Sequence, residues 1–240
     1  MLADSIQARL QSGLLTPDVH PQDTSRKVMI EFIQLQLPRW RDSNGRPAAT
    51  GEDALTSHLC VYLNGAAKDT ALDSIQFAPQ YPTEKHDKRR KPDVTILPRE
   101  LQGILVEGRV HTIYEPVLLI ECKVLPTPKG SKRDEREYVI SGSSSTGGIQ
   151  RFKAGHHGAE HKLAVMIAYV QSETFSFWME SISKWITDLA EAGQPTWTTG
   201  DLLRRKKTDK KQGIAILHSS HTRENDLPKI ELRHLWLKMN

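Results

Sequence analysis

Long apolar runs and short alternating stretches recur along the chain after residue 70. Behind Pro116 comes the run VLLIECKVL, and a second run, LAVMIAYV, covers Leu163–Val170. Runs this long with almost no polar residue are typical of strands buried on both faces of a sheet. Shorter alternating segments predict further strands or hairpins at residues 75–81, 93–97, 101–114, 214–218 and 230–237.

Helical spacing of apolar residues covers most of what remains. The stripe formed by Leu55, Leu59 and Leu63 predicts a helix over residues 52–63, and further helices are expected at 149–162 and 172–191. Residues 1–45 also carry apolar residues at helical spacing. Strands interleaved with helices indicate an α/β fold with a central mixed β-sheet flanked by helices. We therefore expect a helical N-terminal extension, residues 1–45, followed by one domain, residues 46–240.

Composition excludes several classes of protein. The chain has 240 residues with 33 Lys and Arg against 29 Asp and Glu, so its net charge is only +4. No apolar run approaches the ~20 residues that span a bilayer, so we expect no membrane helix. Two cysteines, Cys60 and Cys122, favour free thiols and a cytoplasmic, reducing compartment over a disulfide scaffold. The sequence contains neither the P-loop pattern GxxxxGK[ST] nor the hydrolase pattern GxSxG.

Two acidic residues and a lysine stand out against the apolar strands. Glu121 and Lys123 interrupt VLLIECKVL and, being two residues apart, share one face of the strand. Asp93 begins a strand expected to lie beside it. A structural ion pair is the alternative interpretation, although a buried pair usually adds no net stability. Two carboxylates can hold Mg²⁺, with the Cys122 carbonyl as an extra ligand, and a lysine can hold or deprotonate the attacking water. The set therefore favours phosphodiester hydrolysis.

The segment KPDVTI (residues 91–96) followed by LLIECKV (residues 118–124) resembles the PD-(D/E)XK nuclease superfamily. A helix is expected before these segments and a helix and strand after them, so the resemblance covers residues 52–170, about half of the chain. It implies a restriction-endonuclease-like fold and an endonuclease dependent on Mg²⁺ or Mn²⁺ that cuts DNA and leaves a 5′-phosphate. It also implies a setting in restriction, phage defence or repair, and a homodimer or larger homo-oligomer.

The same resemblance implies roles for individual residues. The catalytic set would be Asp93, Glu121, Lys123, Glu52 and Gln150, and the metal ligands would be Asp93, Glu121, Glu52 and the Cys122 carbonyl. Glu52 matches an acidic residue on the helix before the sheet, with Asp53 as its alternative, and Gln150 matches a glutamine on the helix after the lysine strand. Both also have plain structural explanations, as a helix-start carboxylate and an exposed helix residue.

The 27 residues between Asp93 and Glu121 are enough for an extra hairpin, which raises the question whether Asp93 is the true partner. Asp87 is the alternative. It is a poorer one, because no strand follows it directly.

Three basic runs, residues 85–91, 129–136 and 204–211, fall in expected loops. Such runs are either solvated turns or contacts for phosphates. The residues expected to contact nucleic acid are Lys91, Arg151, Lys153, His221 and Arg223.

Two histidine patterns are weaker signals. Ser219, His221 and Arg223 alternate at a strand end, where they are either substrate contacts or exposed residues; they contain no acid and so predict no Ser–His–acid relay. His157 and His161 have the i,i+4 spacing of zinc ligands but lack a third ligand, so we interpret them as a polar helix face.

A function from another class is compatible with the same residues. The chain is then a nucleic-acid-binding subunit on a nuclease fold, either catalytically silent or active only with a partner subunit. The presence of Asp93, Glu121 and Lys123 together favours the enzyme. The expected partners are DNA, further copies of the chain and an activating subunit, and no membrane.

Overall fold

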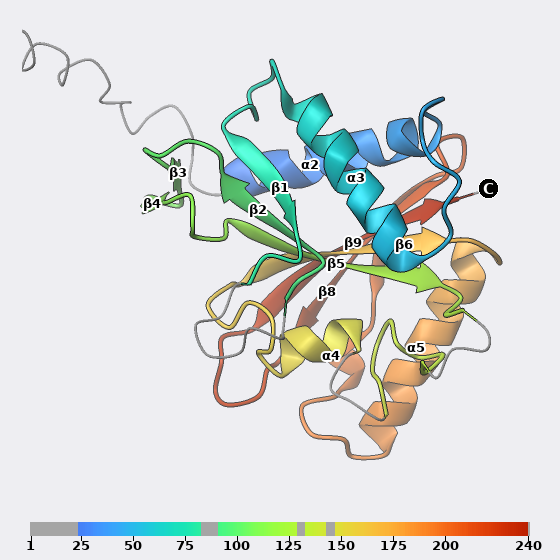
Figure 1. Cartoon of the computed structure of the whole chain (residues 1–240). Coiled ribbons are helices and arrows are strands. Elements are labelled where there is room, and N and C mark those ends of the chain that lie inside the picture. Colours follow the sequence, from blue (N-terminus) through green and yellow to red (C-terminus); the bar gives the residue numbers. More distant parts are fainter. Residues whose placement is uncertain (1–23, 83–90, 129–132, 143–146, 240) are drawn as a thin grey trace, which may run out of the picture.

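The computed structural model describes residues 24–82, 91–128, 133–142 and 147–239. These residues form an α/β structure with a seven-stranded sheet and a separate two-stranded hairpin (Figure 1). The helices are α2 (Thr24–Arg41), α3 (Glu52–Ala67), α4 (Gly148–Lys153), α5 (Phe175–Glu191) and the 3-10 turn η2 (Thr199–Asp201). The strands are β1 (Ile75–Pro79), β2 (Val94–Pro98), β3 (Ile104–Val106), β4 (Arg109–His111), β5 (Leu118–Leu125), β6 (Leu163–Val170), β7 (Arg204–Asp209), β8 (Ile214–His221) and β9 (Ile230–Lys238).

The seven-stranded sheet has the order β1-β2-β5-β6-β9-β8-β7. The central strands β5, β6 and β9 are parallel to one another, and the outer pairs are antiparallel. The predicted mixed sheet is therefore confirmed. The hairpin of β3 and β4 lies between β2 and β5 in sequence, where the long spacer left room for one.

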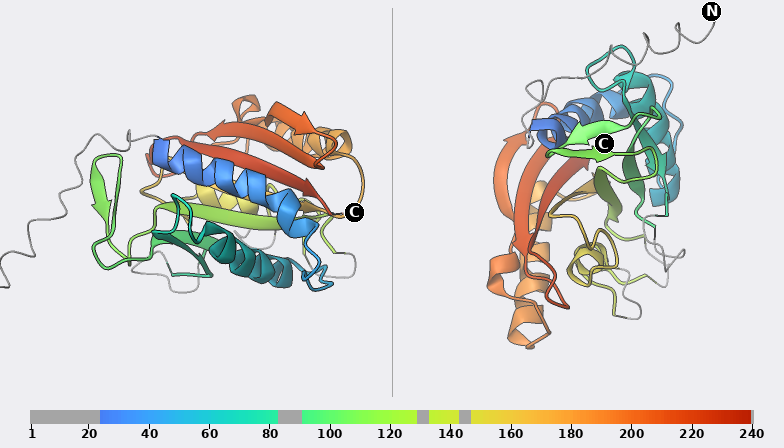
Figure 2. Two further views of the ribbon diagram at one scale, coloured as in Figure 1. Left: turned by 90° about the horizontal axis from the view of Figure 1, so that it is seen from above. Right: turned by 90° about the vertical axis from the view of Figure 1, so that its left-hand side faces the viewer.

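Helices cover both faces of this sheet. In Figures 1 and 2, α2 and α3 lie on one side and α4 and α5 on the other. Strand β5 is buried throughout, with Ile120 and Cys122 packed toward α2 and α3 and Leu119 and Leu125 packed toward α4 and α5. The prediction of a strand buried on both faces is thus confirmed.

Helix α2 belongs to the main core. Its residues Met29, Ile33, Leu37 and Trp40 are buried in the cluster that also contains α3 and one face of the sheet. Of the expected N-terminal extension, residues 1–45, the structure describes α2 and residues 42–45. Residues 1–23 of that extension lie outside the described ranges.

Two elements differ from the predictions. The helix expected over 149–162 ends at Lys153, because Gly155 and Gly158 adopt positive φ angles of 71° and 62° that turn the chain out of the helix. Residues 204–211, expected to be a loop, form strand β7 for most of their length. Its first four side chains are exposed, so their charges stay in water while the backbone pairs with β8.

Cys60 and Cys122 are both buried free thiols, as predicted. Within the ranges that the structure describes, no helix combines the length and the apolar character needed to cross a membrane.

Candidate active site

Antiparallel pairing of β2 with β5 brings Asp93 beside the Glu121–Lys123 segment. Val94 pairs with Ile120, and the backbone N–H of Cys122 donates a 2.7 Å hydrogen bond to Asp93 Oδ2. Asp93 therefore lies next to the E-C-K triplet despite the intervening hairpin. Asp87, the alternative partner, lies outside the described residues.

Lys123 is the centre of the cluster. Its ammonium nitrogen lies 2.9 Å from Glu121 Oε1, 3.0 Å from Glu52 Oε1 and 3.8 Å from Asp93 Oδ2. It also donates to the carbonyl of Cys122 at 2.9 Å. The side chains of Lys123 and Glu121 are 3% and 0% exposed, so this is a buried cation surrounded by carboxylates. The structure thus brings together four of the five residues predicted to be catalytic.

Glu52 reaches this cluster from the first turn of α3, and its oxygens are already engaged. Oε1 accepts from Lys123, Oε2 accepts from the backbone N–H of Val124 at 3.1 Å, and both accept from Arg133. Arg133 also pairs with Glu137. The role of Glu52 in this conformation is therefore to hold Lys123 and the end of β5.

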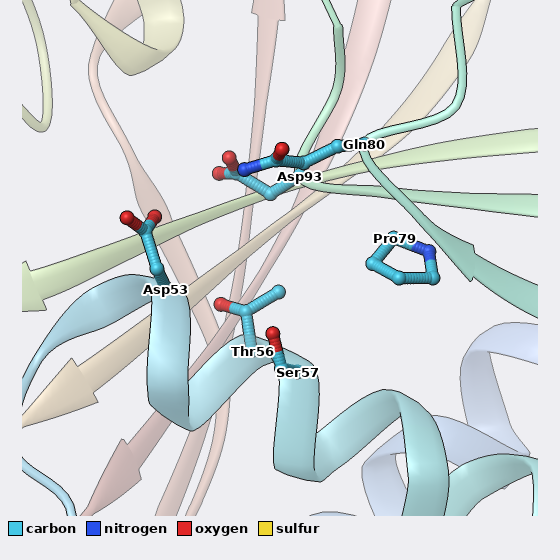
Figure 3. A pocket seen from close by; sticks show the side chains of 6 residues that line it. All are labelled: Asp53, Thr56, Ser57, Pro79, Gln80 and Asp93. Atoms are coloured by element: carbon cyan, nitrogen blue, oxygen red, sulfur yellow. The ribbon is translucent and has the colours of Figure 1, made fainter.

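A cavity of about 200 Å³ opens on the other side of Asp93, lined by Asp53, Thr56, Ser57, Pro79, Gln80 and Asp93. Figure 3 shows the carboxylates of Asp53 and Asp93 directed into the same space, from α3 and from the start of β2. Asp53, the alternative to Glu52, is exposed here and makes the acidic contribution of α3 to the cavity.

Helix α4 contributes Arg151, which pairs with Glu121 Oε1. The second oxygen, Glu121 Oε2, is buried and has no hydrogen-bond partner among the described residues. His157 Nε2 lies 3.9 Å from it, and this imidazole is neutral at pH 7 because burial lowers its pKa to about 4. Gln150 does not reach this cluster. Its side-chain oxygen accepts from the backbone of Ser141 and Gly147, so it caps its own helix.

Burial and mutual repulsion set the protonation states. Burial, together with the nearby Glu121 carboxylate, raises the pKa of Asp93 to about 7. Burial also opposes ionisation of Glu121, but Lys123 and Arg151 outweigh it and lower the Glu121 pKa. For Lys123, burial is outweighed by Glu121 and Asp93, so its pKa is raised and the side chain is an ammonium at neutral pH. Lys123 is therefore a donor of hydrogen bonds in this state, and it is not a base.

Two features of the acidic cluster bear on whether it can hold a hard divalent cation. Glu121 Oε2 is an orphaned buried oxygen, and Asp93 is a carboxyl that needs positive charge beside it to ionise fully. Mg²⁺ often uses one or two carboxylates and completes its shell with water and substrate phosphate. In the described part of the chain, no group of three or more His, Cys, Asp or Glu side chains is arranged to hold a metal.

The predicted nucleic-acid contacts divide into two groups. Lys91 is exposed, and Arg151 is partly exposed while paired with Glu121. The prediction is wrong for Lys153, His221 and Arg223, which are 1%, 0% and 3% exposed. The Arg223 guanidinium donates hydrogen bonds to the backbone carbonyls of residues 152, 158, 159 and 161. It therefore holds together the turns after α4.

His221 belongs to a buried relay that sequence reasoning missed. Its Nδ1 lies 2.7 Å from Asp201 Oδ1 and its Nε2 lies 2.6 Å from Ser219 Oγ, while Lys153 Nζ contacts the same Asp201 oxygen at 2.9 Å. Ser219 Oγ continues to His234 at 2.7 Å. The acid sits on η2, far from the alternating trio in sequence. Ser219 is 2% exposed, so the relay is a chain of buried hydrogen bonds in this arrangement.

No family model, curated protein or solved structure matches this chain at a significant level.

Proposed function

We propose that this chain is a metal-dependent endonuclease that hydrolyses phosphodiester bonds in DNA, with a PD-(D/E)XK type of site. One observation carries the proposal: three carboxylates, from α3, from the residue just before β2 and from β5, lie within 4 Å of the Lys123 ammonium. The sequence context supports it, because α3 precedes these strands and α4 and β6 follow β5. A purely structural ion cluster does not need an unpartnered carboxylate oxygen at its centre.

Asp93 and Glu121 would hold Mg²⁺ or Mn²⁺, and Asp53 or the Cys122 carbonyl would complete the ligand set. When bound, the metal polarises the phosphoryl group and lowers the pKa of the attacking water. Glu121 presents one oxygen for this purpose because Lys123 and Arg151 hold the other.

Lys123 supplies a fixed positive charge to the reaction. As a buried ammonium it offsets negative charge that develops in the transition state, and it can donate a hydrogen bond to the attacking water or to a phosphoryl oxygen only by giving up one of its three contacts, with Glu121, Glu52 or the Cys122 carbonyl. Glu52 and Arg133 act indirectly: Glu52 holds Lys123 and the end of β5 in position, and Arg133 holds Glu52. Arg151 orients Glu121 in the same way.

A partner-activated subunit is the second candidate, and a specific observation favours it. Lys123 occupies both Glu121 Oε1 and the Cys122 carbonyl, two of the oxygens expected to bind metal. A nuclease held in this arrangement is inactive until DNA, a second copy or a partner subunit moves Lys123.

Cleavage of supercoiled plasmid with Mg²⁺, Mn²⁺ or EDTA tests the proposal. We choose Glu121→Gln and Asp93→Asn in place of Lys123→Ala, because removing the buried lysine leaves three carboxylates facing one another. Loss of metal coordination is expected to lower the cleavage rate by at least about 100-fold. The matched control is Asp188→Asn on the exposed surface of α5.

Metal-dependent nicking by the parent and by Asp188→Asn, lost in both site variants, supports the nuclease. Equal cleavage by all four proteins would contradict the assignment. If the parent itself does not cut, addition of the candidate partner or of a second DNA form tests the activated subunit.

A further inference from the structure

Strand β7 forms one outer edge of the seven-stranded sheet and concentrates the positive charge of the chain. Residues 204–211 read RRKKTDKK, six basic side chains against Asp209, which is a net charge of +5 where the whole chain has +4. The remainder of the chain is therefore close to neutral. All six basic side chains are exposed at this edge, which is orange in Figure 2.

Nothing in the described structure neutralises these charges. No described carboxylate forms an ion pair with any of the six basic residues. The strand register extends the patch inward, because Arg204 pairs with His218 and His218 pairs with Arg233. Burial is the main cause of the lowered pKa of His218, and the charges of Arg233, Lys206 and Arg204 lower it further.

Protection of the sheet edge explains part of this charge, because charged side chains, especially lysine, keep an edge strand from pairing with another chain. The edge is further protected by a register shift between Arg205 and Lys207, which interrupts the ladder of backbone groups. The same irregularity disfavours a peptide that would add as an eighth strand. A partner of this edge is thus recognised through side-chain charge and not through the backbone.

The register also relates this edge to the candidate site. Ile214, at the end of the β7–β8 turn, is in line with Leu237, Tyr169 and Val124 across the sheet, and Val124 follows Lys123. The basic turn and the site therefore lie at the same end of the sheet. Four strand spacings separate β5 from β7, a distance of about 19 Å.

We propose that β7 and the β7–β8 turn bind the phosphate backbone of the nucleic acid whose scissile bond lies at Asp93 and Glu121. This inference rests on the proposed function and names a second contact for the same substrate. A span of about 19 Å corresponds to five or six base-pair steps of duplex. The substrate is then a polymer of at least that length, held by charge at one end of the footprint and cut at the other.

The test compares two variants that lose the same charge. Arg204→Gln/Arg205→Gln/Lys206→Gln removes three charges from β7, and Arg39→Gln/Lys68→Gln/Lys184→Gln removes three exposed charges from the helical surface. Binding of a fluorescent 24-base-pair duplex and a 24-nucleotide single strand is measured by anisotropy in EDTA, between 50 and 300 mM salt. Hydrolysis of bis(p-nitrophenyl) phosphate with Mn²⁺ reports the site without the polymer.

We expect the β7 variant to bind duplex about 10- to 100-fold more weakly and to show a salt slope shallower by about 2 to 3, because each phosphate contact contributes about 0.9. The control variant should change Kd by less than about 3-fold, and both should hydrolyse the small diester like the parent. Equal losses in the two variants, or unchanged binding by the β7 variant, would overturn the inference. So would tighter binding to anionic lipid vesicles than to either nucleic acid.

The two proposals fail separately. Because binding is read in EDTA, a parent that cuts nothing while β7 governs binding counts against a nuclease that is active on its own and leaves the β7 surface standing. A parent that cuts, with unchanged binding by the β7 variant, refutes the β7 surface alone.

Discussion

Among single residues, Asp93 is expected to lower the stability of the folded chain when it is ionised. Its carboxylate is buried next to Glu121, and its pKa is raised to about 7. Above pH 7 the ionised form is held at a cost in the folded chain that is absent in the unfolded chain, where the pKa is near 3.9. Asparagine removes that charge and can still accept the hydrogen bond from Cys122 N–H.

We therefore expect Asp93→Asn to raise the free energy of unfolding by about 1–3 kcal/mol at pH 8 in EDTA, while it removes cleavage. Urea unfolding followed by circular dichroism measures the first effect, and Asp188→Asn, on the exposed face of α5, should stay within about 0.5 kcal/mol of the parent. A clear loss of stability in Asp93→Asn would show that the ionised carboxylate is not strained in the folded state.

Buried histidines make a second prediction at this scale. Burial lowers the pKa of His157 and His161 to about 4, and it lowers the pKa of His221 and His234 as well. Below pH 6.5 these histidines bind protons in the unfolded chain but stay neutral in the folded chain. The free energy of unfolding therefore decreases as pH falls. Each contributes a slope of up to about 1.4 kcal/mol per pH unit, and Asp93 opposes them.

Urea midpoints between pH 7.5 and pH 5 should accordingly decrease toward acid. His234→Gln keeps a hydrogen-bonding side chain between Ser219 and Tyr138. It should make the unfolding free energy less dependent on pH, by the contribution of about one titrating proton. An unchanged midpoint across this range would contradict the burial of neutral imidazoles.

At the scale of elements, the buried relay joins parts of the chain that carry the site. Lys153 ends α4, whose Arg151 holds Glu121, and Asp201 on η2 anchors Lys153 to β8 through His221. Lys153 also donates to the carbonyls of Thr196 and Thr222. The position of α4 against β5 thus depends on a carboxylate about fifty residues farther along the chain.

Asp201→Asn should destabilise the protein by about 3–5 kcal/mol, because it leaves the Lys153 ammonium buried without an anion. Adding Lys153→Met should recover about 1–3 kcal/mol of that loss, which a double-mutant cycle in urea measures as coupling. The exposed pair Lys184–Asp188 offers the matched cycle, in which coupling should stay below about 0.5 kcal/mol. Additive losses in the buried cycle would exclude the relay as an anchor of α4.

Elements whose pattern is strong were predictable from the sequence, and others were not. Apolar runs marked β5 and β6, and the interruption of β5 by Glu121 and Lys123 marked the candidate site. Strand β7 was missed because its side chains are charged on both faces, which removes the alternation that identifies a strand. The contacts of Arg133 with Glu52, 81 residues away, and of Asp201 with His221 depend on tertiary packing that no local pattern reports.

For the whole molecule, packing joins the first and last described elements. Met29, Ile33 and Leu37 of α2 share a core cluster with Leu235 and Leu237 of β9, and Arg41 donates to the carbonyl of Lys238 at 2.9 Å. The boundary expected near residue 45 therefore does not separate two packing units in the described structure.

A single cooperative transition should follow. Urea unfolding read by far-ultraviolet circular dichroism and by tryptophan fluorescence should give coincident midpoints, and Leu37→Ala should lower both by the same amount, with a loss of about 2–5 kcal/mol. The rates of amide hydrogen exchange in α2 and in β9 should change together when the stability of the chain is changed. An early transition confined to α2 would establish a separate N-terminal unit.

The place of β9 in the sheet has a consequence for folding. It is the last of the described strands in sequence, yet it lies between β6 and β8. Until β9 docks, the chain can form only two partial sheets, β1-β2-β5-β6 and β8-β7, with no strand to join them. The apolar edge of β6 is then unpaired and open to pairing with other chains. Substitutions that weaken the docking of β9 should thus reduce the yield of soluble protein.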